Sequence, residues 1–232
     1  MAQSRVIEEH NERWHIFTDT DAVREEVTRR LAQTAAAAIG RSGAFHVALA
    51  GGRTPAAIYA QLARQALDWS RWFIYFGDER CLPRGHAERN DTMVHNQWLD
   101  HVAIPIDQVF AMPAELGAED GAANYRRTLA LAPTFDLVLL GLGEDGHTAS
   151  LFPGHPRNGE AVLPVHDAPK PPPDRISLSA PRLSDAHAVW FVVTGEDKRA
   201  ALERWRRGDD IPARAVRPDA GVDIFTDVDV VA

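Results

Sequence analysis

The chain has little cysteine and no excess of basic residues. Its 232 residues include one cysteine, Cys81, so neither an intramolecular disulfide framework nor a cysteine-rich metal site is expected. Lysine and arginine number 25 against 33 aspartates and glutamates, which leaves a formal net charge of −8. Such a chain is poorly suited to bind nucleic acid, because phosphate neutralisation needs a basic face. A small anionic ligand is still compatible, since a few local cations suffice to bind it.

Long apolar segments are absent as well. No apolar run approaches the roughly 18 residues of a membrane helix, and no charged-then-apolar leader opens the chain. The sequence therefore predicts a soluble, cytoplasmic protein with no membrane partner. The proline-rich stretch at 168–173 is too short for a linker and indicates a stiff loop. We expect one domain over residues 1–232, and the sequence leaves the oligomeric state open.

Hydrophobic periodicity predicts alternating strands and helices. Strands are expected at 45–50, 72–76, 135–140, 175–179, 187–193 and 222–225, and helices at 21–39, 55–67, 90–99, 118–131 and 196–206. This alternation indicates a single-domain α/β fold, with a mostly parallel, doubly wound, Rossmann-like sheet and helices on both faces.

Glycine and polar residues directly follow four of the predicted strands. They occupy residues 51–55, 77–80, 141–147 and 194–198. Because the carboxyl ends of parallel strands meet at one edge of a sheet, we expect these segments to form one ligand site.

One of these segments, with a cation from each of two others, suggests an anion pocket. Gly51, Gly52 and Thr54 precede a predicted helix, whose free N–H groups and neighbouring hydroxyl suit a phosphate. An ordinary strand-to-helix turn would need a glycine there too. Arg80 and Lys198 are candidate cations for the same anion. Alternatively, Lys198 is a solvated surface residue and Arg80 pairs with the adjacent acids.

His147 is the candidate acid–base group. Asp145 lies two residues earlier, and a carboxylate beside an imidazole can fix its tautomer and raise its basicity. A structural histidine bonded to a loop carbonyl is the alternative. The other histidines show no metal-ligand spacing, so no metal site is expected. Ser150 is not in G-x-S-x-G, which argues against a Ser–His–Asp hydrolase.

Residues 141–146 also satisfy the dinucleotide pattern G-x-G-x-x-G. That fingerprint should open a long apolar helix, but Pro153 and Pro156 stop any helix soon after His147. We therefore interpret the glycines as part of a turn that presents His147.

Together, these motifs resemble those of the 6-phosphogluconolactonase family. FDLVLLGLGEDGHTASLFPG is similar to the family's D-G-H-T-A-S-L-F-P signature, GGRTP to its glycine motif and FGDERCLP to its acid–arginine motif. PKPPPDRISLSAPRLSDA and VVTGEDKRAAL resemble its C-terminal half. The resemblance spans about residues 45–202, and the closing PDAGVDIFTDVDVVA is also of the family type. Ala50 and Arg53 stand where the glycine motif often has serines.

The resemblance implies hydrolysis of 6-phosphoglucono-δ-lactone to 6-phosphogluconate, in the oxidative pentose phosphate pathway, without a metal or organic cofactor. The partner would be this small sugar-phosphate lactone. His147 would be the general base that activates water, with Asp145 beside it. A lactone is already an activated ester, so a positioned base and a polarising group can suffice. Substrate contacts would come from Gly51, Gly52, Arg53, Thr54, Asp78, Arg80, Arg175 and Lys198.

Two other functions remain as alternatives. The sister glucosamine-6-phosphate deaminases carry Asp-Glu-Tyr at residues 78–80 and Gly-His-Ile-Ala-Phe at 146–150, and this chain departs from both motifs. A non-catalytic sugar-phosphate sensor would need a DNA-binding helix-turn-helix. The segment before residue 45 has one convincing helix and no basic recognition helix. These differences favour the lactonase.

Overall fold

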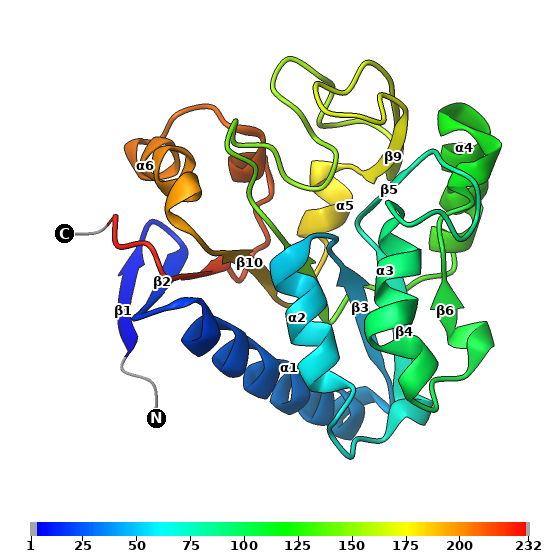
Figure 1. Ribbon diagram of the computed structural model, residues 1–232, viewed down its shortest axis with the longest axis horizontal. Helices are drawn as coiled ribbons and strands as arrows, with labels where there is room; N and C mark the ends of the chain where they lie inside the picture. Colours follow the sequence, from blue (N-terminus) through cyan, green and yellow to red (C-terminus); the bar gives the residue numbers. More distant parts are fainter. Residues whose placement is uncertain (1–3, 231–232) are drawn as a thin grey trace.

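The computed structural model describes residues 4–230 (Figure 1). Within this range the centre is an eight-stranded sheet of order β1-β2-β11-β10-β7-β3-β4-β6. The hairpin β1–β2 is antiparallel, and every other pairing in this sheet is parallel. The predicted α/β class with a mostly parallel sheet is confirmed. The strands are β1 (Ser4–Glu9), β2 (Glu12–Phe17), β3 (Phe45–Leu49), β4 (Trp72–Phe76), β6 (Val109–Phe110), β7 (Leu137–Leu140), β10 (Val189–Val193) and β11 (Val222–Thr226).

Helices lie on both faces of this sheet, as predicted. One face is covered by α1 (Thr20–Ser42), α2 (Arg53–Leu62) and α3 (Asn90–Gln97) (Figure 1). The helices α4 (Ala118–Leu129), α5 (Ala180–Ser184) and α6 (Arg199–Arg207) lie on the other side (Figure 1). None of the helices in residues 4–230 is long and apolar enough to cross a membrane.

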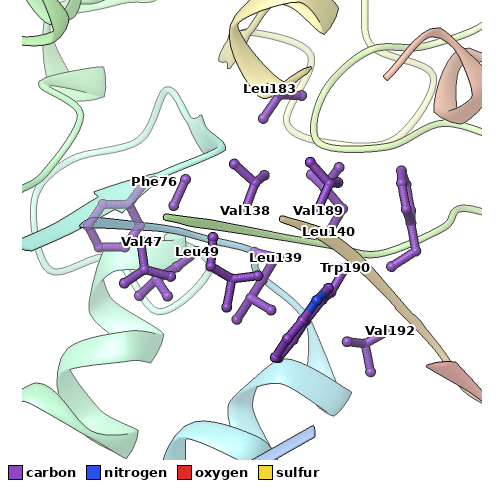
Figure 2. Packing of buried hydrophobic residues seen from close by; sticks show 14 of the residues in the cluster. Val47, Leu49, Phe76, Val138, Leu139, Leu140, Leu183, Val189, Trp190 and Val192 are labelled. Atoms are coloured by element: carbon purple, nitrogen blue, oxygen red, sulfur yellow. The ribbon is translucent and has the colours of Figure 1, made fainter. Parts of the chain in front are cut away.

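The central strands are buried on both faces. Successive side chains of a strand alternate in direction. Val138 and Leu140 accordingly lie on the side of Leu183 from α5, whereas Leu139 and Trp190 lie on the opposite side (Figure 2). A strand covered on both faces needs a continuous apolar run, which explains the sequence of β7.

The order of the inner strands positions the site. Strands β10, β7, β3 and β4 are consecutive neighbours and parallel. Their carboxyl ends therefore share one edge, and the four polar segments that follow them are brought together as the sequence predicts.

A second, smaller sheet was not predicted. The strand expected at 175–179 is β9 (Arg175–Leu178), which pairs antiparallel with β5 (Asp78–Arg80) and β8 (Val162–Val165) and stays outside the parallel sheet. The hairpin β1–β2 was also missed.

Several predicted ends differ from the structure. The predicted helix 55–67 begins at Arg53 and ends at Leu62. The helix predicted at 196–206 is a 3₁₀ turn, Glu196–Lys198, followed by α6. The assignment of residues 1–232 to one domain stays a prediction, because residues 1–3 and 231–232 lie outside the described residues.

Candidate active site

A cavity of about 410 Å³ lies at the carboxyl edge of the inner strands. Seven of the ten predicted site residues line it: Gly51, Gly52, Asp78, Arg80, His147, Arg175 and Lys198. Arg53, Thr54 and Asp145 do not line it. The cavity also involves residues that the sequence analysis did not single out as candidates, among them Asn90, Phe152 and Lys170.

His147 is oriented by Asp145. The Nδ1 atom of His147 lies 2.5 Å from Asp145 Oδ1, and the backbone N–H of His147 donates to the same oxygen at 3.1 Å. Burial raises the pKa of Asp145, but these hydrogen bonds outweigh it, and its pKa lies below the ordinary value. An ionised carboxylate accepts only, so Nδ1 carries the proton and Nε2 presents its lone pair. Asp145 therefore acts from behind the ring, outside the cavity.

The glycines of this turn make room for the imidazole. A Cβ atom at Gly143 would lie 2.0 Å from His147 Nδ1. Gly146 has φ +86°, and a Cβ there would lie 2.7 Å from Ile211. The ring of Phe152 packs against the imidazole, with 4.7 Å between ring centroids. The G-x-G-x-x-G pattern is thus a close-packed support for His147, as the sequence analysis interpreted it.

Two arginines face each other across the small sheet. Arg80 and Arg175 are register partners on β5 and β9, a placement that is unfavourable for like charges. Burial lowers the pKa of Arg175, and the charge of Arg80 acts in the same direction. Arg175 donates to the carbonyls of Lys170, Pro171 and Pro172, and Arg80 donates to that of Glu88. Within the described residues, Arg80 Nε is buried without a partner. An anion bound beside these guanidiniums would relieve their repulsion.

The glycine loop and Lys198 also line the cavity. Gly52 is the N-cap of α2, and no side chain caps this end of the helix, which leaves N–H groups for an anion. Lys198 Nζ lies 3.3 Å from Asp197 and 3.8 Å from Glu144, so these surface carboxylates compensate its charge only partly.

Thr54 and Arg53 are placed differently from the expectation. The hydroxyl of Thr54 lies 2.7 Å from that of Thr194, which ties the loop after β3 to the loop after β10. Arg53 is exposed at the start of α2. Neither side chain is part of the cavity lining, so a direct contact with ligand stays a prediction for both.

Asp78 is fixed on both carboxylate oxygens. Ser150 Oγ donates to Oδ2 at 2.6 Å, and Asn90 Nδ2 donates to Oδ1 at 3.1 Å and to the Asp78 carbonyl at 2.9 Å. A Cβ at Gly51 would lie 2.0 Å from Asn90 Oδ1, so the glycine loop also lies against this amide. Asp78 is nearly fully buried, yet it is one of the residues that line the cavity. It is suited to accept hydrogen bonds from ligand hydroxyls.

Sequence comparison identifies the family. The family model described as glucosamine-6-phosphate isomerases/6-phosphogluconolactonase matches residues 18–225. The chain belongs to this family. A 6-phosphogluconolactonase of Streptomyces coelicolor is 40% identical over 208 residues, covering 81% of this chain and 80% of that protein. One of Rattus norvegicus is 37% identical over 227 residues, covering 89% and 87%. The resemblance inferred from the motifs is therefore confirmed.

The fold is that of solved members of the glucosamine-6-phosphate isomerase/6-phosphogluconolactonase family. The crystal structure of 6-phosphogluconolactonase from Thermotoga maritima superposes with a TM-score of 0.87 at 26% identity, covering 92% of this chain and 98% of that one. The large mixed sheet and its two helical layers are thus family features.

Proposed function

We propose that this protein hydrolyses 6-phosphoglucono-δ-lactone to 6-phosphogluconate, in the oxidative pentose phosphate pathway. The observation that carries the proposal is the Asp145–His147 pair, which presents a proton-accepting nitrogen at a cavity lined by Arg80, Arg175 and Lys198. The lactonase relatives named above support the substrate.

The chemistry follows from the tautomer of His147. Nε2 removes a proton from water as the water oxygen attacks the lactone carbonyl carbon, and a tetrahedral oxyanion forms. Asp145 stabilises the resulting imidazolium, which then donates its proton to the ring oxygen as the C–O bond breaks. The product is a hydroxy acid. Positive charge of the lining that the phosphate does not use, such as that of Arg175, favours the oxyanion over the neutral carbonyl, which lowers the barrier.

The remaining polar groups provide recognition. Gly51, Gly52, Arg80 and Lys198 supply N–H donors and positive charge for the phosphate, and Asp78 accepts from sugar hydroxyls. We further propose that the protein acts in the cytoplasm, needs no cofactor and binds no nucleic acid. Among residues 4–230, no group of three or more His, Cys, Asp or Glu side chains is arranged as a metal site.

The test is an assay of the purified protein on freshly generated 6-phosphogluconolactone, with spontaneous hydrolysis subtracted. Turnover above that background, unchanged by exhaustive chelation, is expected. A rate equal to the background would contradict the proposal, as would ammonia release from glucosamine 6-phosphate in its place. Activity lost on chelation and restored by a divalent ion would contradict the metal-independent chemistry alone.

A further inference from the structure

Glu79 is a buried carboxylate directly behind the cavity. Its chain neighbours on β5, Asp78 and Arg80, both line the cavity, whereas Glu79 does not and has no exposed surface. Since strand side chains alternate in direction, Glu79 points to the opposite side of β5. Nothing in the hydrolysis described above uses it.

The carboxylate accepts hydrogen bonds from three backbone N–H groups. Oε1 accepts from Arg80 at 2.9 Å and from Asn90 at 2.7 Å, and Oε2 accepts from Asp91 at 2.8 Å. Asn90 and Asp91 begin helix α3, so Glu79 occupies the place of a capping side chain at that helix end. Both Arg80 and Asn90 are cavity-lining residues.

These contacts link Glu79 to three parts of the lining. Through Arg80 it fixes the backbone of a cationic residue. Through Asn90 it fixes the amide that donates to Asp78 and lies against Gly51. A loss of the Glu79 carboxylate would therefore alter the positions of Asp78, Arg80 and the glycine loop together.

The surroundings of Glu79 set its protonation. Burial, and the charge of Asp91, raise the pKa of Glu79 to about 7, although backbone hydrogen bonds oppose them. Arg89 is equally buried, and its Nε lies 3.9 Å from Glu79 Oε2, but its guanidinium is bonded to Asp91 and Glu115. Arg175, Cys81 and Tyr125 are near enough to interact electrostatically with Glu79 as well.

Protonation would weaken the arrangement. The three groups that face the carboxylate oxygens are all N–H donors. A proton on Glu79 would point at one of these N–H groups, which would then have no acceptor. A buried unpaired N–H costs about 1–3 kcal/mol. The ionised form is the one that matches the start of α3.

We propose that Glu79 is a positioning residue for the lactone hydrolysis: its ionised carboxylate holds Asn90 and Arg80 in the geometry that binds substrate, without touching substrate itself. This inference rests on the function proposed above. It predicts an effect on KM that depends on pH.

The experiment compares Glu79→Gln with Glu115→Gln. The control removes a carboxylate that bonds the same Arg89, and its other partner, Arg84, does not line the cavity either. KM and kcat for 6-phosphogluconolactone are measured from pH 6 to 8. Glu79→Gln should raise KM at pH 8 about tenfold or more, the effect of one lost hydrogen bond to a charged group. Glu79→Asp, which keeps the charge, should recover part of the loss.

The pH dependence separates positioning from a general loss of stability. In the wild type and Glu115→Gln, KM should rise as pH falls through about 7, because Glu79 gains a proton. In Glu79→Gln this rise should shrink to the part that comes from the substrate phosphate, which also titrates near pH 6. Equal KM values and equal pH profiles in both glutamine variants would overturn the inference.

A second variant covers the case in which Glu79→Gln does not fold. Asn90→Ala removes the amide through which Glu79 acts on Asp78, so the rise of KM at low pH should be smaller than in the wild type. An unchanged rise would overturn the inference. A wild type without lactonase activity refutes the proposed function, whereas an active wild type matched by Glu79→Gln refutes this inference alone.

Discussion

At the scale of single residues, the imidazole of His147 is fixed by three contacts: Asp145 on one nitrogen, Gly143 against the ring edge and Phe152 against its face. We expect His147→Ala to lower kcat by about 10²–10⁴, the usual size of a general-base loss, with an unchanged fold. His155 packs edge-on against Phe152 and is not among the residues that line the cavity, so His155→Ala is the matched control. Background-corrected kcat and circular dichroism test this. Full activity in folded His147→Ala would leave His147 a structural residue.

The glycines of the same turn offer a sharper contrast. A methyl group at Gly143 collides with the His147 ring, whereas one at Gly141 meets no atom within 4 Å. Gly143→Ala should therefore reduce kcat nearly as much as His147→Ala, and Gly141→Ala should retain the His147–Asp145 hydrogen bond. The imidazole NMR resonances report that bond directly. Normal kcat and unchanged resonances in Gly143→Ala would contradict this prediction, because the turn would then have shifted to make room for the methyl group.

The cations around the cavity should discriminate the phosphorylated substrate. We expect Arg80→Ala and Lys198→Ala each to raise KM for 6-phosphogluconolactone by about 10- to 150-fold, the value of one charge-assisted hydrogen bond. KM for unphosphorylated gluconolactone should change little. The double variant should be less than additive if both cations bind one phosphate. An equal rise of KM for both lactones would mean that these residues contact the sugar or support the fold, and do not bind the phosphate.

The site residues that could be predicted share one property: each belongs to a short, contiguous motif that indicates its chemistry. Asp145 and His147 are two residues apart, and Gly51 and Gly52 open a helix directly after a strand. Asn90 and Lys170 gave no such signal, because they reach the cavity from segments far from any strand end of the parallel sheet. An asparagine at the predicted start of a helix was the available hint for Asn90.

At the scale of elements, strand β11 is joined to the hairpin by a buried ionic cluster. Asp223 accepts from Arg13 at 2.7 and 2.9 Å, and His15 Nε2 lies 2.7 Å from its Oδ1 atom. Burial raises the pKa of Asp223, but the hydrogen bonds from His15 and Arg13 outweigh it, and the net shift is downward from 3.8. The carboxylate is thus a stabilising contact between β2 and β11 wherever it is ionised.

We expect Asp223→Asn to lower the free energy of unfolding by about 1–3 kcal/mol at neutral pH, because Asp223 is buried but its partner Arg13 is partly exposed to solvent. Because the folded pKa is depressed, this contribution is complete above the unfolded pKa and is lost as pH falls through the folded one. The difference between wild type and variant should therefore be constant above about pH 5 and shrink below 3.8. Urea unfolding at several pH values measures it. The exposed pair Arg157–Asp210 provides the control, since Asp210→Asn should have far less effect. A constant difference down to pH 2 would contradict this account.

The elements that were not predicted have sequences without the usual pattern of a strand or a turn. The hairpin β1–β2 carries charges on most exposed positions, and its turn residues His10 and Asn11 adopt φ of 48° and 70° without a glycine. Strand β8 contains Pro164, which argues against a strand, and β5 is only three residues long. The inner strands were predictable because burial on both faces demands continuous apolar runs.

At the scale of the whole molecule, one apolar core runs through both layers beside the sheet and includes residues of the small sheet, such as Ile176 and Val162. We expect the chain to unfold in one cooperative step, with equal calorimetric and van't Hoff enthalpies. Product at a hundredfold excess over its Kd should add about 2.7 kcal/mol to the stability. Loss of activity at a lower urea concentration than loss of far-ultraviolet ellipticity would mean that the small sheet and its arginines unfold separately.

The place of β11 in the sheet determines an order of assembly. Its neighbours are β10 on one side and β2 on the other, so the hairpin at residues 4–17 joins the sheet only through residues 222–226. During synthesis, β3, β4, β7 and β10 can pair in turn as each strand emerges. The hairpin cannot join the sheet until β11, near the end of the chain, has been made. Contacts between such distant segments are slow to form. We therefore expect docking of the hairpin to be a late step of folding, after the inner strands have shaped the cavity.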